Sequence, residues 1–199
     1  MIKTLYPTFQ KWSANGSIYI ISDTHFFDKD RKLMGYDITE EQQLEILKKY
    51  CHSNDTLIHL GDVGYPELLQ QIKAYKVLVM GNHDETATQF EHYFNEIYKG
   101  PIWIAEKLVL SHESLSLCSG TTGRPIAFNI HGHNHDKYES YYEDYHFHLN
   151  ITQNVFGYEP LNLNTFIKDG YLKYVKSIHR EIIDNATENK VNKEKFENY

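Results

Sequence analysis

Five short apolar runs constrain most strongly what this chain can fold into. They span residues 18–21 (IYII), 56–60 (TLIHL), 77–80 (VLVM), 107–110 (KLVL) and 127–130 (AFNI). Each run is bounded by polar residues or glycine, and each has the length of a buried strand. Helical patterns separate the first three runs, so strand and helix alternate through the first half of the chain, as in an α/β protein.

Three helical patterns lie between these runs. The first begins with the capping-box pair Thr39 and Gln42 and carries apolar residues at positions 44, 47 and 51. Pro66 suits the first turn of a second helix, with apolar residues at 68, 69, 72 and 75. Thr86 and Gln89 repeat the capping-box spacing, so we expect a third helix that carries apolar residues at 90, 93, 94 and 97.

The second half has a different character. Residues 101–106, 145–151, 164–168 and 171–178 have the composition of strands, and Asp169-Gly170 between the last two indicates a hairpin turn. We therefore expect an α/β fold, a four-layer αββα sandwich of two mixed sheets flanked by helices. A single domain would cover residues 1–185, and the polar stretch 186–199 would be a tail or a short helix.

Composition excludes several classes of protein. No run approaches the roughly 18 apolar residues that a membrane span needs, and we expect no membrane partner. The first residues lack the apolar core of a secretory signal, and Cys51 and Cys118 are too few for a disulfide framework. We expect both cysteines to be buried, inert thiols in a cytoplasmic protein. The net charge of −7 argues against duplex nucleic acid as a partner.

Every apolar run is followed by side chains that can bind a metal. The segments are Asp23-x-His25, Gly61-Asp62, Gly81-Asn82-His83-Asp84, Ser111-His112 and Gly132-His133-x-His135. Ligands of α/β sheets bind beyond the carboxyl ends of the strands, where these segments lie. Alternate side chains of an extended chain share a face, so Asp23 and His25 would converge if the first strand continues that far.

The ligand types indicate transition metals. Two aspartates, one asparagine and four or five histidines, without cysteine, suit Mn, Fe, Zn, Co or Ni rather than Mg or Ca. Seven groups are too many for one tetrahedral ion and suit two divalent or mixed-valence ions that share one carboxylate. In the segment HGHNH, His131, His133 and His135 alternate onto one face, and the Gly-His-x-His frame favours His133 and His135 as ligands. His131 would then be a supporting or core histidine.

Simpler interpretations compete at each position. Taken alone, each of these segments is also ordinary turn or cap chemistry. Arg31, Arg124 and Lys137 are candidate phosphate-binding cations, although a solvated surface position is the more common role. The remaining histidines are expected to be structural or solvated, with His146 and His148 retained as candidate substrate contacts: His52, His59, His92, His146, His148 and His179.

The ordered set of segments closely resembles the calcineurin-like metallophosphoesterase family. More narrowly, SDTHFF, SHESL, NIHGHNH and NVFGYEPLNL look like a small bacterial and phage subgroup of predicted phosphoesterases. The resemblance implies that Asp23, His25 and His135 hold one metal, and that Asn82, His112 and His133 hold the other. Asp62 would bridge both ions.

The resemblance also implies a reaction. A hydroxide bridging the two metals would attack phosphorus, and His83, oriented by Asp84, would protonate the leaving oxygen or stabilise the transition state. This chain departs from the family pattern at Ser111, where glycine is common, and at Asp28, where many members of the subgroup carry histidine. The roles of Asp28, His131, His146 and His148 stay open.

The expected function is hydrolysis of phosphodiesters, with phosphomonoesters as the second choice. The substrate would be a small phosphate ester or a nucleotide-type molecule, and loops 26–37 and 119–125 would carry specificity. A nuclease acting on short single strands is a further possibility. The alternative from another class is a non-catalytic metal-binding interaction scaffold of the same fold.

Overall fold

Two mixed sheets form the centre of the molecule. The computed structural model describes residue 12 and residues 16–120, 122–136 and 147–178. The first sheet has the strand order β4-β3-β2-β1-β9, in which β1 to β4 are parallel and β9 is antiparallel to β1. Its strands are β1 (Ile18–Ile21), β2 (Thr56–His59), β3 (Tyr75–Val79), β4 (Glu96–Tyr98) and β9 (Leu161–Asn162).

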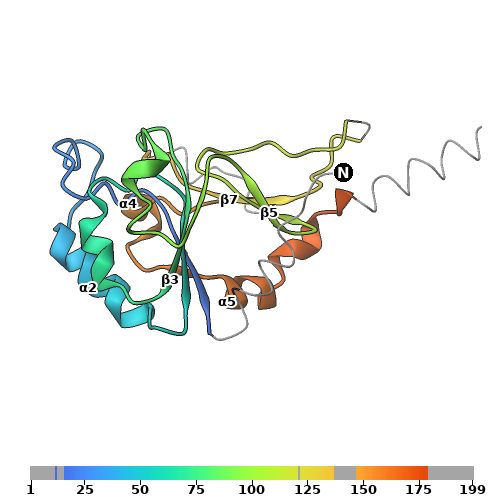
Figure 1. The fold of residues 1–199 in the computed structure, drawn as a ribbon. Helices are drawn as coiled ribbons and strands as arrows, with labels where there is room; N and C mark the ends of the chain where they lie inside the picture. The colour runs from blue at the N-terminus through green and yellow to red at the C-terminus, as the bar shows by residue number, and fades with distance from the viewer. Residues whose placement is uncertain (1–11, 13–15, 121, 137–146, 179–199) are drawn as a thin grey trace, which may run out of the picture.

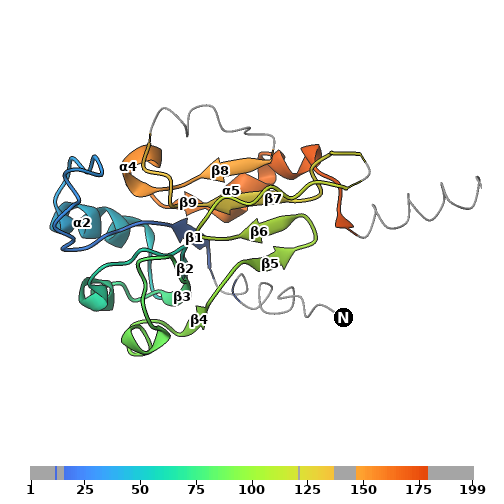
Figure 2. The ribbon, with the colours of Figure 1, turned by 90° about the horizontal axis from the view of Figure 1, so that it is seen from above.

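The second sheet has four strands in the order β5-β6-β7-β8 (Figure 2). Here β6, β7 and β8 are parallel, and β5 is antiparallel to β6. The strands are β5 (Ile102–Ala105), β6 (Leu108–Leu110), β7 (Phe128–His131) and β8 (His148–Asn150). Parallel pairing in both sheets matters for the site, because it brings the carboxyl ends of neighbouring strands to one edge.

The hydrophobic core is divided between the two faces of the first sheet. Along β1, Ile18 and Ile20 face the second sheet, whereas Ile21 faces the opposite side, as the two-residue period of a strand requires. That opposite side is covered by α2 (Glu40–Tyr50) and the 3₁₀ helix η1 (Pro66–Gln71) (Figure 1). Helix α5 (Leu163–Lys168) packs Leu163 and Phe166 against the core between the sheets.

The expected α/β fold with two mixed sheets is confirmed, whereas the fourth layer stays a prediction. The outer face of β7 carries Asn129, whose side chain accepts a hydrogen bond from the backbone N–H of Leu115 at 2.7 Å. In the described part of the chain, a loop rather than a helix therefore makes this contact with the outer face of the second sheet.

Two expected strands near the C-terminus are wrong. Residues 164–168 belong to α5, and residues 171–178 begin with the 3₁₀ helix η3 (Tyr171–Tyr174). The Asn162 side chain caps α5 by accepting hydrogen bonds from the backbone of Asn164 and Thr165. Gly170 adopts φ 82°, the left-handed conformation that commonly ends a helix, so the Asp-Gly pair is a helix terminus rather than a hairpin turn.

Of the three expected helices, one is confirmed and two are shorter than expected. The first is confirmed as α2, with the Thr39–Gln42 capping box formed. The second is only the short η1, and Tyr75 begins β3 instead of extending a helix. The third shrinks to the 3₁₀ turn η2 (Ala87–Gln89), because Thr86 makes no capping hydrogen bond, and Ile97 lies in β4. A short helix α4 (Gln153–Phe156), which we did not expect, follows β8.

Other expectations have mixed outcomes. Cys51 is buried as expected, but Cys118 is exposed, so that expectation is wrong. Among the described residues, no helix is long and apolar enough to cross a lipid bilayer. The expected tail at 186–199 lies outside the described residues, and the domain limits stay predictions.

Candidate metal centre

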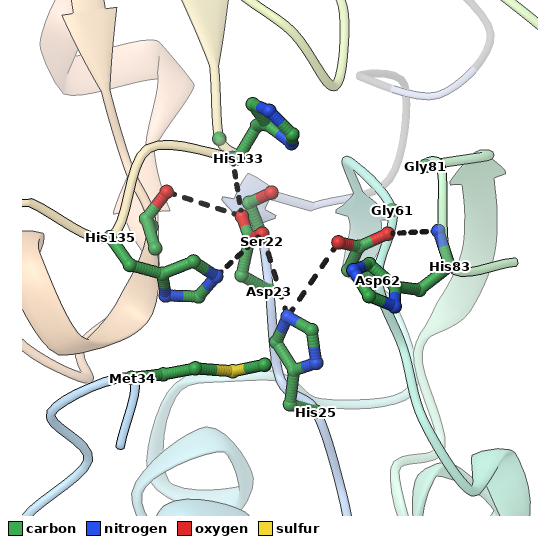
Figure 3. A network of polar contacts seen from close by, with 12 residues as sticks. Ser22, Asp23, His25, Met34, Gly61, Asp62, Gly81, His83, His133 and His135 are labelled. Atoms are coloured by element: carbon green, nitrogen blue, oxygen red, sulfur yellow. Dashed lines mark hydrogen bonds and ion pairs between the residues drawn. The ribbon is translucent and has the colours of Figure 1, made fainter. Parts of the chain in front are cut away.

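The potential ligands meet at the edge of the molecule where the carboxyl ends of both sheets come together (Figure 3). In the first sheet, Asp23 follows β1, Asp62 follows β2, and the Asn82-His83 pair follows β3. In the second sheet, His112 follows β6, and both His133 and His135 follow β7. Five chain segments therefore contribute to one site, and its formation depends on the two sheets packing together.

The ligand loops have an unusual backbone. Asp23, His25, Asp62 and His133 have φ values of 55°, 42°, 55° and 68°, which is the left-handed region that non-glycine residues rarely adopt. The first strand therefore ends at Ile21, and β7 ends at His131. Our expectation that strand alternation aligns these side chains is wrong, because tight turns aim them instead.

Backbone hydrogen bonds join the first two ligand loops. The N–H of Asp23 donates to the carbonyl of Gly61 at 2.9 Å, and the N–H of His25 donates to the carbonyl of Asp62 at 3.0 Å. Glycine is required at Gly61 and Gly132, because a Cβ at Gly132 would overlap the Asp23 carboxylate, and Gly61 has φ 93° beside the backbone of Gly81.

One cluster consists of Asp23, His25 and His135. The Asp23 Oδ2 atom accepts hydrogen bonds from the His133 backbone N–H at 2.9 Å and from the Thr152 hydroxyl at 3.2 Å. Its other oxygen, Oδ1, is buried without a hydrogen-bond partner, as is Nε2 of His25. Oδ1 lies 3.6 Å from His135 Nε2 and 3.9 Å from His25 Nε2.

A second cluster consists of Asp62, His112 and His133. Asn82 adds its amide oxygen, which lies 2.8 Å from His112 Nε2 and 3.0 Å from His133 Nδ1. His112 Nε2 and His133 Nδ1 are 3.1 Å apart. Four polar atoms from four segments thus converge here, and the sequence had suggested each of these residues.

Asp62 lies between the two clusters. Its Oδ2 atom is 3.6 Å from His25 Nε2 in the first cluster and 3.4 Å from His112 Nε2 in the second. Its Oδ1 atom accepts a hydrogen bond from the His83 backbone N–H at 2.9 Å. This position, in contact with both clusters, is the one that a bridging carboxylate would occupy.

Supporting contacts fix the orientation of three histidine rings. Nδ1 of His112 donates to the Leu60 carbonyl at 2.8 Å, so its Nε2 faces the centre. Nδ1 of His25 is 3.2 Å from Asp28 Oδ2, and Nδ1 of His135 is 2.8 Å from Asn154 Oδ1. Asp28, whose role the sequence left open, therefore holds a ring of the first cluster.

Thr152 and Asn154 are supporting residues that sequence reasoning missed. The available signal was their place after the strand at 148–150, since other segments that follow strands carry the ligands. Asn154 also donates to the carbonyls of Met34 and His135, at 2.7 and 3.3 Å, and so joins the loop after β1 to the loop after β7.

Burial and neighbouring charges determine the pKa values in the site. Burial lowers the pKa of His25, although Asp23 and Asp62 oppose the shift. Burial also acts to lower the pKa of His112, but the carboxylates of Asp62 and Asp23 outweigh it and raise the pKa to about 9. Burial of Asp62 is outweighed by its contacts with His112, and its pKa falls to about 2. The two carboxylates, Asp23 and Asp62, thus favour positive charge on the groups around them.

These residues fit transition-metal ions. Two buried polar atoms without partners, Asp23 Oδ1 and His25 Nε2, are costly in a protein interior unless something binds them. In each cluster the candidate ligand atoms lie within 4.8 Å of one another, and they are a mixture of nitrogen and carboxylate oxygen. That mixture suits Mn, Fe, Zn, Co or Ni.

Asp84 and His83 occupy different environments. The buried Asp84 carboxylate accepts three backbone hydrogen bonds, from Asp62 at 2.9 Å, Val63 at 3.1 Å and Gly81 at 2.9 Å. These bonds hold the loop after β2 against the loop after β3, and none of them involves the His83 ring. The His83 side chain is exposed, and its ring centre lies 5.5 Å from that of His25.

Several expected candidates lie elsewhere. Arg31 is buried, not solvated, and its guanidinium contacts Gln43 and Glu40 at 3.2 Å. His131 and His148 lie side by side on the outer face of the second sheet, with ring centres 5.9 Å apart. Loop 119–125 precedes the start of β7 and so lies at the edge opposite the ligands. His146, His179 and Lys137 fall outside the described residues.

The chain is similar to known proteins in sequence and in structure. Residues 17–151 match the model of the calcineurin-like phosphoesterase superfamily domain. A protein of unknown function from Aquifex aeolicus, AQ665, is similar in structure, with a TM-score of 0.61 and 26% sequence identity. The match covers 76% of this chain and 98% of that one.

A more distant solved structure is the nuclease MPE from Pseudomonas putida, with 22% identity and a TM-score of 0.40. This match covers 58% of this chain and 60% of the other. No curated protein matches the chain.

Proposed function

Because the chain belongs to the calcineurin-like phosphoesterase superfamily, we propose that it is a metal-dependent hydrolase of phosphodiesters. The observation that carries the proposal is the pair of buried, unpartnered atoms Asp23 Oδ1 and His25 Nε2, which lie beside a second ligand cluster. A site of this kind, with Asp62 in contact with both clusters, is suited to two ions rather than one.

The proposed ligands are the seven that the sequence suggested. Asp23, His25 and His135 would hold one ion, and Asn82, His112 and His133 the other, with Asp62 shared. When bound, two transition-metal ions supply an activated water and neutralise charge on the phosphate. An ion held by the second cluster would replace the proton of His112, whose pKa without an ion is about 9.

His83 is the proposed proton donor to the leaving oxygen. Its backbone N–H is fixed by Asp62, and its exposed side chain stands next to His25, at the mouth of the centre. A positioned histidine of this kind contributes roughly 10²- to 10⁴-fold to a rate. Asp84 would contribute indirectly, by holding the loop that carries Asn82 and His83.

Two cavities beside the centre favour a diester over a monoester. A cleft of about 610 Å³ is lined by His83 and Asp28. A smaller hollow of about 270 Å³ is lined by other residues, which include Asn82 and His112. A phosphodiester carries two substituents on phosphorus, one for each cavity, whereas a monoester would leave one cavity unused.

The test is hydrolysis of bis-p-nitrophenyl phosphate with added Mn²⁺, alongside calorimetric measurement of bound metal. We expect turnover in the native protein and near-background rates in Asp62→Asn, which keeps the side-chain shape but removes the shared charge. Asp169→Asn, the same change at a remote exposed position, is the matched control and should keep full activity.

Two results would refute the proposal. One is unchanged turnover in Asp62→Asn. The other is a protein that binds two ions but hydrolyses neither diesters nor p-nitrophenyl phosphate, in which case a non-catalytic scaffold becomes the better interpretation.

A further inference from the structure

The 610 Å³ cleft is continuous with the proposed centre at two points. His83 lines the cleft, and its ring lies beside His25 with 5.5 Å between ring centres. Asp28 lines it too and contacts Nδ1 of His25 at 3.2 Å. The volume is within the range of pockets that bind small molecules. A group that departs from phosphorus toward His83 would therefore enter this cleft.

Aromatic side chains stand open at the cleft. Tyr65 lines it and is 60% exposed, and Phe27 beside it is 51% exposed, with the two rings in an edge-to-face arrangement 6.1 Å apart. Phe27 has φ 58°, a strained conformation for an aromatic residue. Exposed aromatic rings next to a catalytic centre offer faces on which a planar group can stack.

The charge of the cleft is one-sided. Asp28, Glu67 and Glu85 line it, and no lysine or arginine does so among the residues that the structure describes. The lining of the smaller hollow, by contrast, includes Lys99. A leaving group with its own phosphate or carboxylate would be repelled by three carboxylates, whereas an uncharged group would not.

We propose that this cleft is the leaving-group subsite, and that the substrate is a phosphodiester whose leaving alcohol carries an uncharged planar ring. A nucleoside has this chemistry, whereas a nucleotide does not. In the reaction, water supplies the oxygen that replaces the alcohol on phosphorus. The bond from phosphorus to the alcohol oxygen breaks, and His83 gives that oxygen a proton. The attacking water releases one proton to solvent, and His83 regains one from solvent. The inference rests on the proposed function.

Binding can be measured without turnover. Benzyl(methyl)phosphinate carries both substituents on P–C bonds, which are not hydrolysed, and (3-carboxybenzyl)(methyl)phosphinate adds one negative charge to the ring. Isothermal titration of the Mn²⁺-loaded protein gives the ratio of their dissociation constants. We expect the ligand with the uncharged ring to bind at least about tenfold more tightly than the ligand with the carboxylated ring. Repulsion between carboxylates in a partly hydrated cleft has about this effect on a dissociation constant.

Two double variants locate the cause. Glu67→Gln with Glu85→Gln should reduce the ratio to about two- or threefold, because two of the cleft's charges are removed. Glu45→Gln with Glu106→Gln changes net charge equally at exposed positions outside the cleft, and should leave the ratio unchanged. Tyr65→Ala should weaken binding of the ligand with the uncharged ring about fivefold, whereas Tyr65→Phe should preserve this binding.

Equal binding of the two ligands by the native protein would overturn the inference, as would an equal change of the ratio in both double variants. Failure of the proposed function is visible separately. Hydrolysis of bis-p-nitrophenyl phosphate without ligand discrimination refutes only the subsite. Discrimination without hydrolysis of any phosphate ester refutes the catalytic proposal, and the leaving-group role with it, but leaves the cleft as a binding site for an uncharged ring.

Discussion

Replacement of Asp84 with alanine separates a structural role from a catalytic one. The buried carboxylate accepts hydrogen bonds from the backbone N–H groups of Asp62, Val63 and Gly81. Asp84→Ala would leave three donors without their partner in the interior of the ligand loops. Since the side chain makes no hydrogen bond with the His83 ring, we expect the loss to appear first in stability.

The magnitude follows from the three bonds. A hydrogen bond to a charged group contributes about 1.5 kcal/mol or more, so three amount to roughly 5 kcal/mol. Burial raises the pKa of Asp84, which shows that the ionised form is itself costly and offsets part of this sum. A net loss on the order of a few kcal/mol is still a large share of the stability of an ordinary domain.

Urea unfolding of the metal-free protein at pH 7 measures this loss. Glu85→Ala, an exposed neighbour, is the matched control and should change the free energy of unfolding by less than about 0.5 kcal/mol. His83→Ala should also leave stability unchanged while it slows turnover. A stable Asp84→Ala protein with the same kinetic defect as His83→Ala would refute this reasoning and restore an orienting role for Asp84.

Three further predictions follow from particular contacts. Burial lowers the pKa of His59 to about 3 from its ordinary 6.5, so only the unfolded chain takes up this proton between those values. The stability that depends on neutral His59 is therefore fully present above pH 6.5 and decreases as the pH is lowered, by about 2 kcal/mol at pH 5. Urea unfolding of the native protein and of His59→Gln at several pH values measures this decrease. Asp28→Ala should weaken Mn²⁺ binding by about 10- to 100-fold in calorimetry, because Nδ1 of His25 loses its partner, and Asp30→Ala should not. Gly132→Ala should lower the free energy of unfolding by roughly 1 to 3 kcal/mol, because the added methyl group overlaps the Asp23 carboxylate. For the same reason it should lower the number of ions bound. A variant that binds the full number of ions would contradict this prediction.

The fold was predictable where local patterns and packing agree. The buried apolar runs predicted β1, β2, β3, β6 and β7, and the capping box of Thr39 predicted the start of α2. Predictions were wrong where one sequence pattern is compatible with two local structures. Asp169-Gly170 suits a hairpin turn and a helix terminus equally, and only the cap supplied by Asn162 decides in favour of α5.

The candidate site divides in the same way. The sequence suggested all the residues of both clusters, because each follows a strand whose position the apolar runs reveal. Thr152 and Asn154 were missed, because only their place after a strand indicated them, and their contacts with Asp23 and His135 are made between residues distant in the sequence. The structural role of Asp84 was also hidden, because backbone acceptor positions leave no spacing pattern in a sequence.

The left-handed turns determine which substitutions can report cleanly on the chemistry. A left-handed residue costs most side chains about 1 to 2 kcal/mol, but asparagine accepts this conformation readily. Asparagine at Asp23 or Asp62 should therefore leave the loops in place, whereas alanine there would confound a chemical defect with a rearranged backbone. The histidines at 25 and 133 have the same requirement. For this centre, the choice of replacement residue is thus dictated by backbone conformation before charge or size is considered.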